Sequence, residues 1–313
     1  MGQVNEIKGK VVRVRGCFAG PILGLAAWLL AVAPARAVDI EPRSYSNAPA
    51  GMNFLVAGYG YSDGGLSTDP SSPLQDASLW ISTGFLAYVR TLDLWGKSGK
   101  IDVIVPYSDL SGNALVNGTP AERHVSGFND PRLRLSVNFF GAPALSAKEF
   151  AGYRQDLIVG ASLQVAPPIG QYDPDRLVNI GTNSWFIKPE VGISKALGAF
   201  TLELAAAVFF YTVNDDYFGG RTLEKDPLYS GQAHLIYSFG RGAWVALDGA
   251  YDYGGRATID GVRDKALGNS RVGITLALPV SRSSSIKMFA STGTTTRAGT
   301  EYDLFGTAWQ YRW

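Results

Sequence analysis

Residues Tyr229–Tyr253, YSGQAHLIYSFGRGAWVALDGAYDY, give the clearest indication of the fold class. If Gly240-Arg241-Gly242 forms a three-residue turn, Phe239 faces Ala243, and every later pair of the hairpin follows. An apolar face opposite a mixed polar face predicts a hairpin that lies between lipid and a polar lumen. The apolar face pairs Tyr237 with Val245, Leu235 with Leu247, Gly231 with Tyr251 and Tyr229 with Tyr253; the other pairs Ser238 with Trp244, Ile236 with Ala246, His234 with Asp248 and Ser230 with Asp252.

The same period-two alternation recurs along the chain in twelve segments of about ten residues, which is the pattern of transmembrane β-strands. An even number of strands suits a closed single-chain barrel. A secreted soluble sandwich also alternates, so alternation alone leaves that alternative open until the protein is fractionated. The segments lie near 52–61, 81–92, 100–107, 128–140, 155–166, 184–195, 199–212, 229–239, 243–253, 270–279, 284–293 and 302–313.

Loop lengths favour the membrane barrel, because long and short connections fall on opposite ends. Connections near 62–80, 108–127, 167–183, 213–228 and 254–269 are long, whereas 196–198, 240–242 and 280–283 are short. The sequence therefore predicts an all-β, closed antiparallel transmembrane β-barrel over residues 51–313, with short periplasmic turns and long external loops. The connection 141–154 is an exception, since it is long on the short-turn side.

The N-terminus predicts export. Four basic residues in 1–15 precede an apolar run over 16–33, and Ala35-Arg36-Ala37 matches a signal-peptidase site. We expect residues 1–37 to be a cleaved signal peptide and 38–50 a short periplasmic segment; Pro21 and Pro34 disfavour the alternative of a permanent anchor. Cleavage changes 28 basic and 27 acidic residues to 23 and 26, a net charge of −3, and removes Cys17, the chain's one cysteine.

Composition excludes several classes. Charged residues make up 18% of the chain and its net charge is +1, so we expect no nucleic-acid partner. Two histidines, His124 and His234, and no mature cysteine give no His/Cys cluster for a metal, and we expect no cofactor. One G-x-S-x-G stretch occurs, GYSDG at 60–64, but it stands in a strand and loop with no helix after it, so we expect no enzyme. One alternative stays open, a lipid-acting enzyme at the outer rim that uses His124 and Ser126.

The last strand indicates how such a barrel is assembled. Alternate positions from Phe305 to the terminal Trp313 are mostly aromatic. This ending resembles the signal read by the outer-membrane assembly machinery, with Trp in place of the usual Phe. We therefore expect two partners, the assembly machinery and outer-membrane lipid.

Ionisable residues are predicted on the inward face of the barrel. A carboxylate opposite His234 would favour the imidazolium, which could gate the lumen or bind a ligand hydroxyl, although a structural pair is the favoured interpretation. Both charge signs occur, so the lumen is no obvious ion filter; mutual compensation and a conducting role both stay open. The candidates for the lumen or substrate path are Arg132, Arg134, Lys188, Glu190, Glu203, His234, Asp248, Asp252, Arg271 and Lys287.

Several stretches resemble one family over residues 45–313. They are PPIGQYD at 167–173, NIGTNSWFIKPE at 179–190, PAGMNF at 49–54, GFNDP at 127–131, NDDY at 214–217 and DPL at 226–228. The chain resembles outer-membrane transporters of the phenol meta-pathway degradation family, although GFNDP departs from that family's usual Gly-Leu-Gly-Asp-Pro.

The resemblance implies a barrel that passes small hydrophobic or aromatic solutes. Twelve strands predict a narrow or partly filled lumen, which suits passive or facilitated diffusion. A structural or adhesive barrel without transport is the further alternative. Neither the family nor the residues identify the solute.

Overall fold

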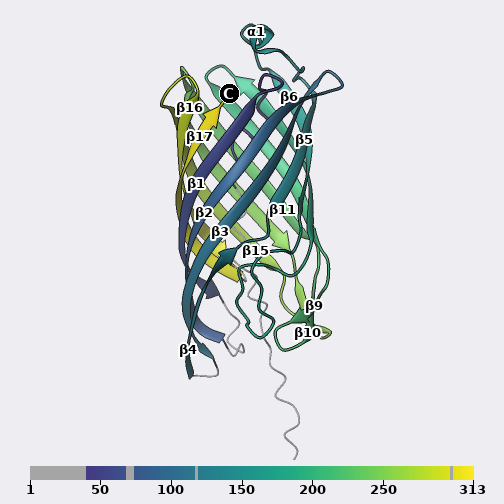
Figure 1. The fold of residues 1–313 in the computed structure, drawn as a ribbon, viewed down its shortest axis with the longest axis vertical. Helices are drawn as coiled ribbons and strands as arrows, with labels where there is room; N and C mark the ends of the chain where they lie inside the picture. The colour runs from purple at the N-terminus through teal and green to yellow at the C-terminus, as the bar shows by residue number, and fades with distance from the viewer. Residues whose placement is uncertain (1–39, 68–73, 117–118, 297–298) are drawn as a thin grey trace, which may run out of the picture.

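The computed structural model describes residues 40–67, 74–116, 119–296 and 299–313 (Figure 1). The predicted signal peptide 1–37, with Cys17, lies outside these residues. The described part has one helix, α1 (Ala147–Phe150), within the 141–154 connection. No helix there is long and apolar enough to cross a membrane.

Thirteen strands form one sheet that closes on itself, because β2 and β3 pair and join its two ends. β4 and β5 both pair with β3 and follow each other along the chain, so the barrel has twelve strand positions, as predicted. The strands are β1 (Asn53–Ser67), β2 (Leu74–Leu94), β3 (Lys97–Val116), β4 (Thr119–Phe128), β5 (Arg132–Phe140), β6 (Leu157–Ala166), β7 (Phe186–Leu197), β8 (Phe200–Tyr211), β11 (Leu228–Gly240), β12 (Ala243–Gly254), β15 (Leu267–Pro279), β16 (Ser284–Thr296) and β17 (Gly299–Arg312).

The first strands are longer than the sequence suggested. The expectation of loops at 62–80 and 108–127 is wrong for most of those residues, because β1 to β4 continue to pair toward the long-loop end, at the bottom of Figure 1. Their inward side chains include Leu79 and Leu110, which pack against Leu177 and Val178 of the 167–183 loop. This added apolar core explains why strands form where the sequence was interpreted as loop.

Two other long connections carry a second sheet of four short strands: β9 (Asn214–Tyr217), β10 (Arg221–Lys225), β13 (Ala257–Ile259) and β14 (Val262–Arg263). Tyr217, Leu223 and Ala257 form its buried core. The sheet lies at the long-loop end, where Figure 1 labels β9 and β10.

The register predicted for the β11–β12 hairpin is confirmed from Ser238–Trp244 onward. The pair Phe239–Ala243 is wrong, since Gly240 faces Ala243 after a bulge. Gly240, Arg241 and Gly242 have φ angles of 84°, 53° and 88°. Two of these three left-handed positions are glycine, which adopts such angles without a Cβ clash.

The barrel is inverted relative to a soluble protein, with apolar side chains outside and charges inside. Leu86, Leu135, Leu247 and Ile274 are exposed on its outer surface, whereas Glu203 is 2% exposed within. An outward apolar belt around a closed sheet is the arrangement of a transmembrane barrel.

Candidate functional site: the lumen and its N-terminal plug

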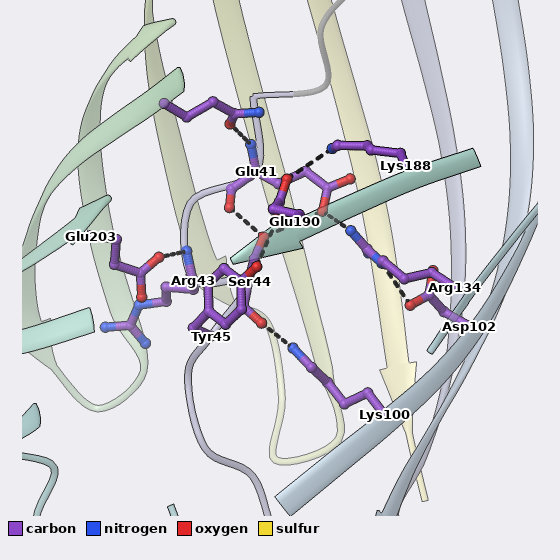
Figure 2. A network of polar contacts seen from close by, with 11 residues as sticks. Glu41, Arg43, Ser44, Tyr45, Lys100, Asp102, Arg134, Lys188, Glu190 and Glu203 are labelled. Atoms are coloured by element: carbon purple, nitrogen blue, oxygen red, sulfur yellow. Dashed lines mark hydrogen bonds and ion pairs between the residues drawn. The ribbon is translucent and has the colours of Figure 1, made fainter. Parts of the chain in front are cut away.

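Residues 40–46, the N-terminal plug, lie inside the barrel (Figure 2). After the plug, the chain leaves the lumen beside the short turns, where Thr91 Oγ1 donates to Pro49 O at 2.6 Å. The expectation that 38–50 is a periplasmic segment is therefore wrong for the plug. The reason is electrostatic, since its polar groups complement buried polar groups of the wall.

Arg134 on β5 is the centre of this complementarity. It forms ion pairs with Glu41 of the plug and with Asp102 on β3, the latter at 2.9 Å (Figure 2). The Lys188 ammonium lies 2.9 Å from the Glu190 carboxylate on the adjacent wall. Buried charges are costly unless they are paired, so the plug contributes a partner that this wall needs.

Arg43 and its neighbour Ser44 contact the wall on two sides. The Arg43 backbone N–H donates to a Glu203 oxygen at 2.6 Å, and its guanidinium donates to Ser238 Oγ at 2.8 Å. The guanidinium also lies 5.0 Å from the Trp244 ring centroid, a cation–π distance. Lys100 donates to the Ser44 carbonyl (Figure 2).

Tyr45 fits a hollow made by glycines. Its hydroxyl donates to Glu190 at 2.8 Å. Its ring occupies the space that a Cβ would need at Gly160 and at Gly192. These two glycines in β6 and β7 therefore make room for the Tyr45 ring. A side chain pointing into the lumen at either position would collide with it.

The long connection 141–154 binds the chain at residues 47–50, where it leaves the lumen after the plug. Ala50 N–H donates to Leu145 O at 2.8 Å, and the Asn47 amide donates to Pro143 O at 3.2 Å. Ser146 and Glu149 form a capping box that starts α1 in this connection. The exceptional length of this connection is explained by these contacts with residues 47–50.

The His234–Asp248 pair is present as predicted. The His234 Nδ1 atom lies 2.7 Å from an Asp248 oxygen, and Thr275 Oγ1 donates to the other oxygen at 2.8 Å. The two side chains of the pair are 3% and 0% exposed. A buried pair in which both Asp248 oxygens are hydrogen-bonded supports the structural interpretation over a gating one.

The remaining predicted lumen residues are not among those drawn in Figure 2, although the Lys287 ammonium is close enough to attract the Glu41 carboxylate of the plug. The Arg271 guanidinium stacks 3.7 Å from the Tyr302 ring centroid and donates to Ser291 Oγ at 2.8 Å. Asp252 is buried on β12. Arg132 and Lys287 are half-buried on β5 and β16, and Lys287 Nζ lies 6.0 Å from the Phe289 ring centroid. The ten candidates are thus spread around the lumen rather than gathered in one site.

Five residues of the network were missed by the sequence interpretation. The alternation of 100–107 would have placed Lys100 and Asp102 inward, and Asp102 is the direct strand partner of Arg134. Glu41, Arg43 and Tyr45 carried a weaker signal, a charged stretch after a predicted cleavage site. No sequence pattern within that stretch predicts that it lies inside the barrel.

His124 and Ser126 do not form the pair considered for lipid chemistry. Both lie on β4, which the sequence interpretation took for loop, and the His124 side chain is 70% exposed. His124 Nδ1 is 2.9 Å from Ser111 Oγ, whereas the strand partner of Ser126 is Asp109. Among the described residues, no group of three or more His, Cys, Asp or Glu is placed to hold a metal ion.

Comparisons with known proteins agree with this architecture. An outer membrane channel from Pseudomonas putida F1 is 19% identical, with a TM-score of 0.75 over 88% of this chain and 100% of that one. The transport unit of the autotransporter AIDA-I from Escherichia coli is 8% identical, with a TM-score of 0.53 over 90% of this chain and 94% of that one. These likenesses show the fold.

At the level of sequence, no curated protein matches. The model of one family, described as "Putative MetA-pathway of phenol degradation", matches residues 59–311. That match spans most of the barrel, from the first strand to the last. The chain belongs to this family.

Proposed function

We propose that the protein is a channel of the bacterial outer membrane that admits small hydrophobic or aromatic compounds by passive diffusion. The observation that carries this proposal is a twelve-strand barrel with an apolar outer belt, whose lumen is narrowed by its own N-terminal plug. The short turns would face the periplasm and the long loops the exterior.

A general pore for ions and sugars suits this lumen poorly. Its charged wall pairs with Glu41 and Arg43 of the plug rather than with solvent. A wide porin leaves a water-filled lumen, whereas a narrow, internally paired one favours solutes that need little hydration. The family description mentions phenol degradation, and the protein of similar fold is an outer membrane channel; together they favour a channel for aromatic compounds.

The proposal includes the route to the membrane. Cleavage after Ala37 would release a chain that begins at Val38, two residues before the described plug. Trp309, Tyr311 and Trp313 stack in series, with ring centroids 6.0 and 5.8 Å apart. This aromatic edge would be read by the assembly machinery and would then lie at the lipid interface, where aromatic rings gather. The proposed channel has no catalytic step.

Cells with an intact lipopolysaccharide layer provide the test, because simple phospholipid bilayers leak apolar solutes. We expect expression of the protein in a channel-deficient Gram-negative strain to raise the initial uptake rate of labelled naphthalene or phenol. An unchanged rate, with the protein assembled in the outer membrane, would overturn the transport proposal. Unchanged uptake together with zero conductance in planar bilayers would indicate a structural barrel.

The lipid-acting alternative is tested separately on the same membranes. Phospholipid hydrolysis that is lost in both His124→Ala and Ser126→Ala variants would favour an enzyme over a channel. Hydrolysis absent from the wild type, or unaffected by both substitutions, would remove that site.

A further inference from the structure

The inner surface of the barrel has two chemically different walls. One wall, formed by β3, β5–β8, β11 and β12, carries the charged side chains described above. The opposite wall consists of β16, β17, β1 and β2, which are neighbours in the sheet and lie on the left of Figure 1. We call its lumen-facing surface the apolar strip. Its larger apolar members are Val56, Phe85, Phe289 and Leu304.

These side chains point inward. Tyr59 and Leu86, on the same two strands as Val56 and Phe85 but on the opposite face, are exposed on the outer belt. Successive residues of a strand alternate between its faces, so Val56 and Phe85 face the lumen. The same argument, from exposed Met288 and Phe305, places Phe289 and Leu304 inside.

Exposure shows which wall borders the free part of the lumen. Glu203, His234 and Asp248 on the charged wall are 2%, 3% and 5% exposed, because neighbours and the plug cover them. The four large members of the apolar strip are each half-buried and keep accessible surface inside the barrel. The described side-chain contacts of Glu41, Arg43 and Tyr45 fall on the charged wall. Ile40 lies at Gly273 of β15, the strand beside β16, so the described plug residues reach one edge of the strip and leave its four large apolar side chains partly exposed.

The strip has a floor of small residues between two aromatic rings. In one row of the sheet, Gly60 of β1 faces Gly306 of β17, and in the next row Gly58 faces Ala308. The Phe85 ring occupies the space of a Cβ at Gly58, and the Phe289 ring does so at Gly306. Both rings thus lie across glycines of the wall instead of extending into the lumen.

Charge is sparse on this surface and lies at its β16 edge, where the Arg271 guanidinium of the neighbouring strand β15 donates to Ser291 Oγ at 2.8 Å. In these two rows and the row on either side, the lumen-facing positions of β16, β17, β1 and β2 hold one ionisable residue, Lys287. It lies at the edge of the strip, on β16. The charged wall opposite has Lys100, Asp102, Lys188 and Glu190 among its lumen-facing residues (Figure 2).

We propose that the apolar strip is the binding track for solute, and that it takes small uncharged aromatic rings, which stack on Phe85 and Phe289. This inference rests on the proposed function and adds the surface and the ligand chemistry. When an aromatic solute binds to the strip, one face of its ring is transferred from water to apolar contact, and this transfer is favourable. Offset or edge-to-face contact with two phenyl rings adds a preference for aromatic over aliphatic solutes. The charged wall offers such a solute no comparable apolar contact.

A pair of double variants separates polarity from size. Leu and Gln have similar volumes, so Phe85→Gln with Phe289→Gln makes the strip polar, whereas Phe85→Leu with Phe289→Leu keeps it apolar. In cells with an intact lipopolysaccharide layer, we expect the Gln variant to lower the initial uptake rate of naphthalene about tenfold, because it removes the apolar surface as well as the two aromatic contacts. We expect the Leu variant to lower it about threefold, because it keeps the apolar surface and loses only the aromatic contacts. Single-channel conductance should not fall in either variant.

Heat-modifiable gel migration verifies that both variants fold and reach the outer membrane. Equal uptake by the Gln variant and the wild type would overturn the strip while leaving the channel proposal standing. An equal loss in both variants, with conductance lowered in parallel, would also overturn it, because the rings would then only set the size of the lumen. Absence of uptake by the wild type itself is the distinct failure of the proposed function.

Discussion

The substitution Arg134→Met tests whether ion pairing holds the plug in the lumen. Arg134 pairs with Glu41 of the plug and Asp102 of the wall, and the Asp102 side chain is 5% exposed. Removing one partner of a buried ion pair costs about 3–5 kcal/mol, because the remaining charge stays uncompensated. Lys100 and Lys188 lie nearby and offset part of this loss, so we expect about 3 kcal/mol. That value raises the ratio of released to docked plug roughly a hundredfold.

Two readouts report this release. Ser46→Cys introduces a thiol at the last residue of the plug, into a chain whose native cysteine, Cys17, lies in the predicted signal peptide. We expect faster labelling of this thiol by a membrane-impermeant maleimide in the Arg134→Met background, together with larger single-channel conductance in planar bilayers. Lys195→Met is the matched control, since Lys195 and Asp156 are 44% and 78% exposed and such pairs contribute only about 0–1 kcal/mol.

The reasoning fails if Arg134→Met leaves both labelling and conductance at the wild-type level. Misfolding of the wall is separated by adding Asp102→Asn, which removes the stranded wall carboxylate. If the plug is held as described, the double variant should restore barrel stability and still show the faster labelling, because Glu41 stays unpaired. Restored stability with wild-type labelling would mean that other contacts hold the plug.

Three further changes test other parts of the structure. Asp248→Leu leaves His234 without its buried acceptor and should lower the free energy of unfolding in urea by about 2 kcal/mol, whereas exposed Asp109→Asn should change it little. Asp130→Ala removes the acceptor of bonds from 170 and 182 in the 167–183 loop, so external protease should cut that loop faster in intact cells. Leu135→Arg places a charge on the lipid-facing belt and should cost about 2–4 kcal/mol in a lipid-vesicle refolding titration; a loss near zero would contradict the membrane assignment.

The strands that contact lipid on one face could be predicted from sequence, because the environment imposes a strict period of two on them. Thus the pairs of the β11–β12 hairpin followed from the position of one turn, and His234 opposite Asp248 followed from those pairs. The external continuations of β1 to β4 could not be predicted in this way. There the inward residues Leu79 and Leu110 pack on residues of a distant loop, and local alternation does not report such a partner.

The plug illustrates the same limit more strongly. Glu41 and Arg43 have no regular secondary structure that a periodic pattern could reveal, and their partners are 93 or more positions away in sequence. What could have been deduced is an excess of inward charge on the wall. A lumen with Arg134, Lys188 and Glu190 facing inward requires partners, and in a narrow barrel the chain's own terminus can supply them.

Charge balance links the plug to the way in which the lumen would conduct. Of the charged side chains in Figure 2, Arg43, Lys100, Arg134 and Lys188 are basic and Glu41, Asp102, Glu190 and Glu203 are acidic. The plug itself contributes one of each sign, Arg43 and Glu41, so its release leaves the net charge of the lumen unchanged. Release therefore widens the lumen without changing its charge balance. The Arg134→Met variant subtracts one positive charge and should become mildly cation-selective, whereas deletion of residues 40–46 should raise conductance with an unchanged reversal potential in a salt gradient.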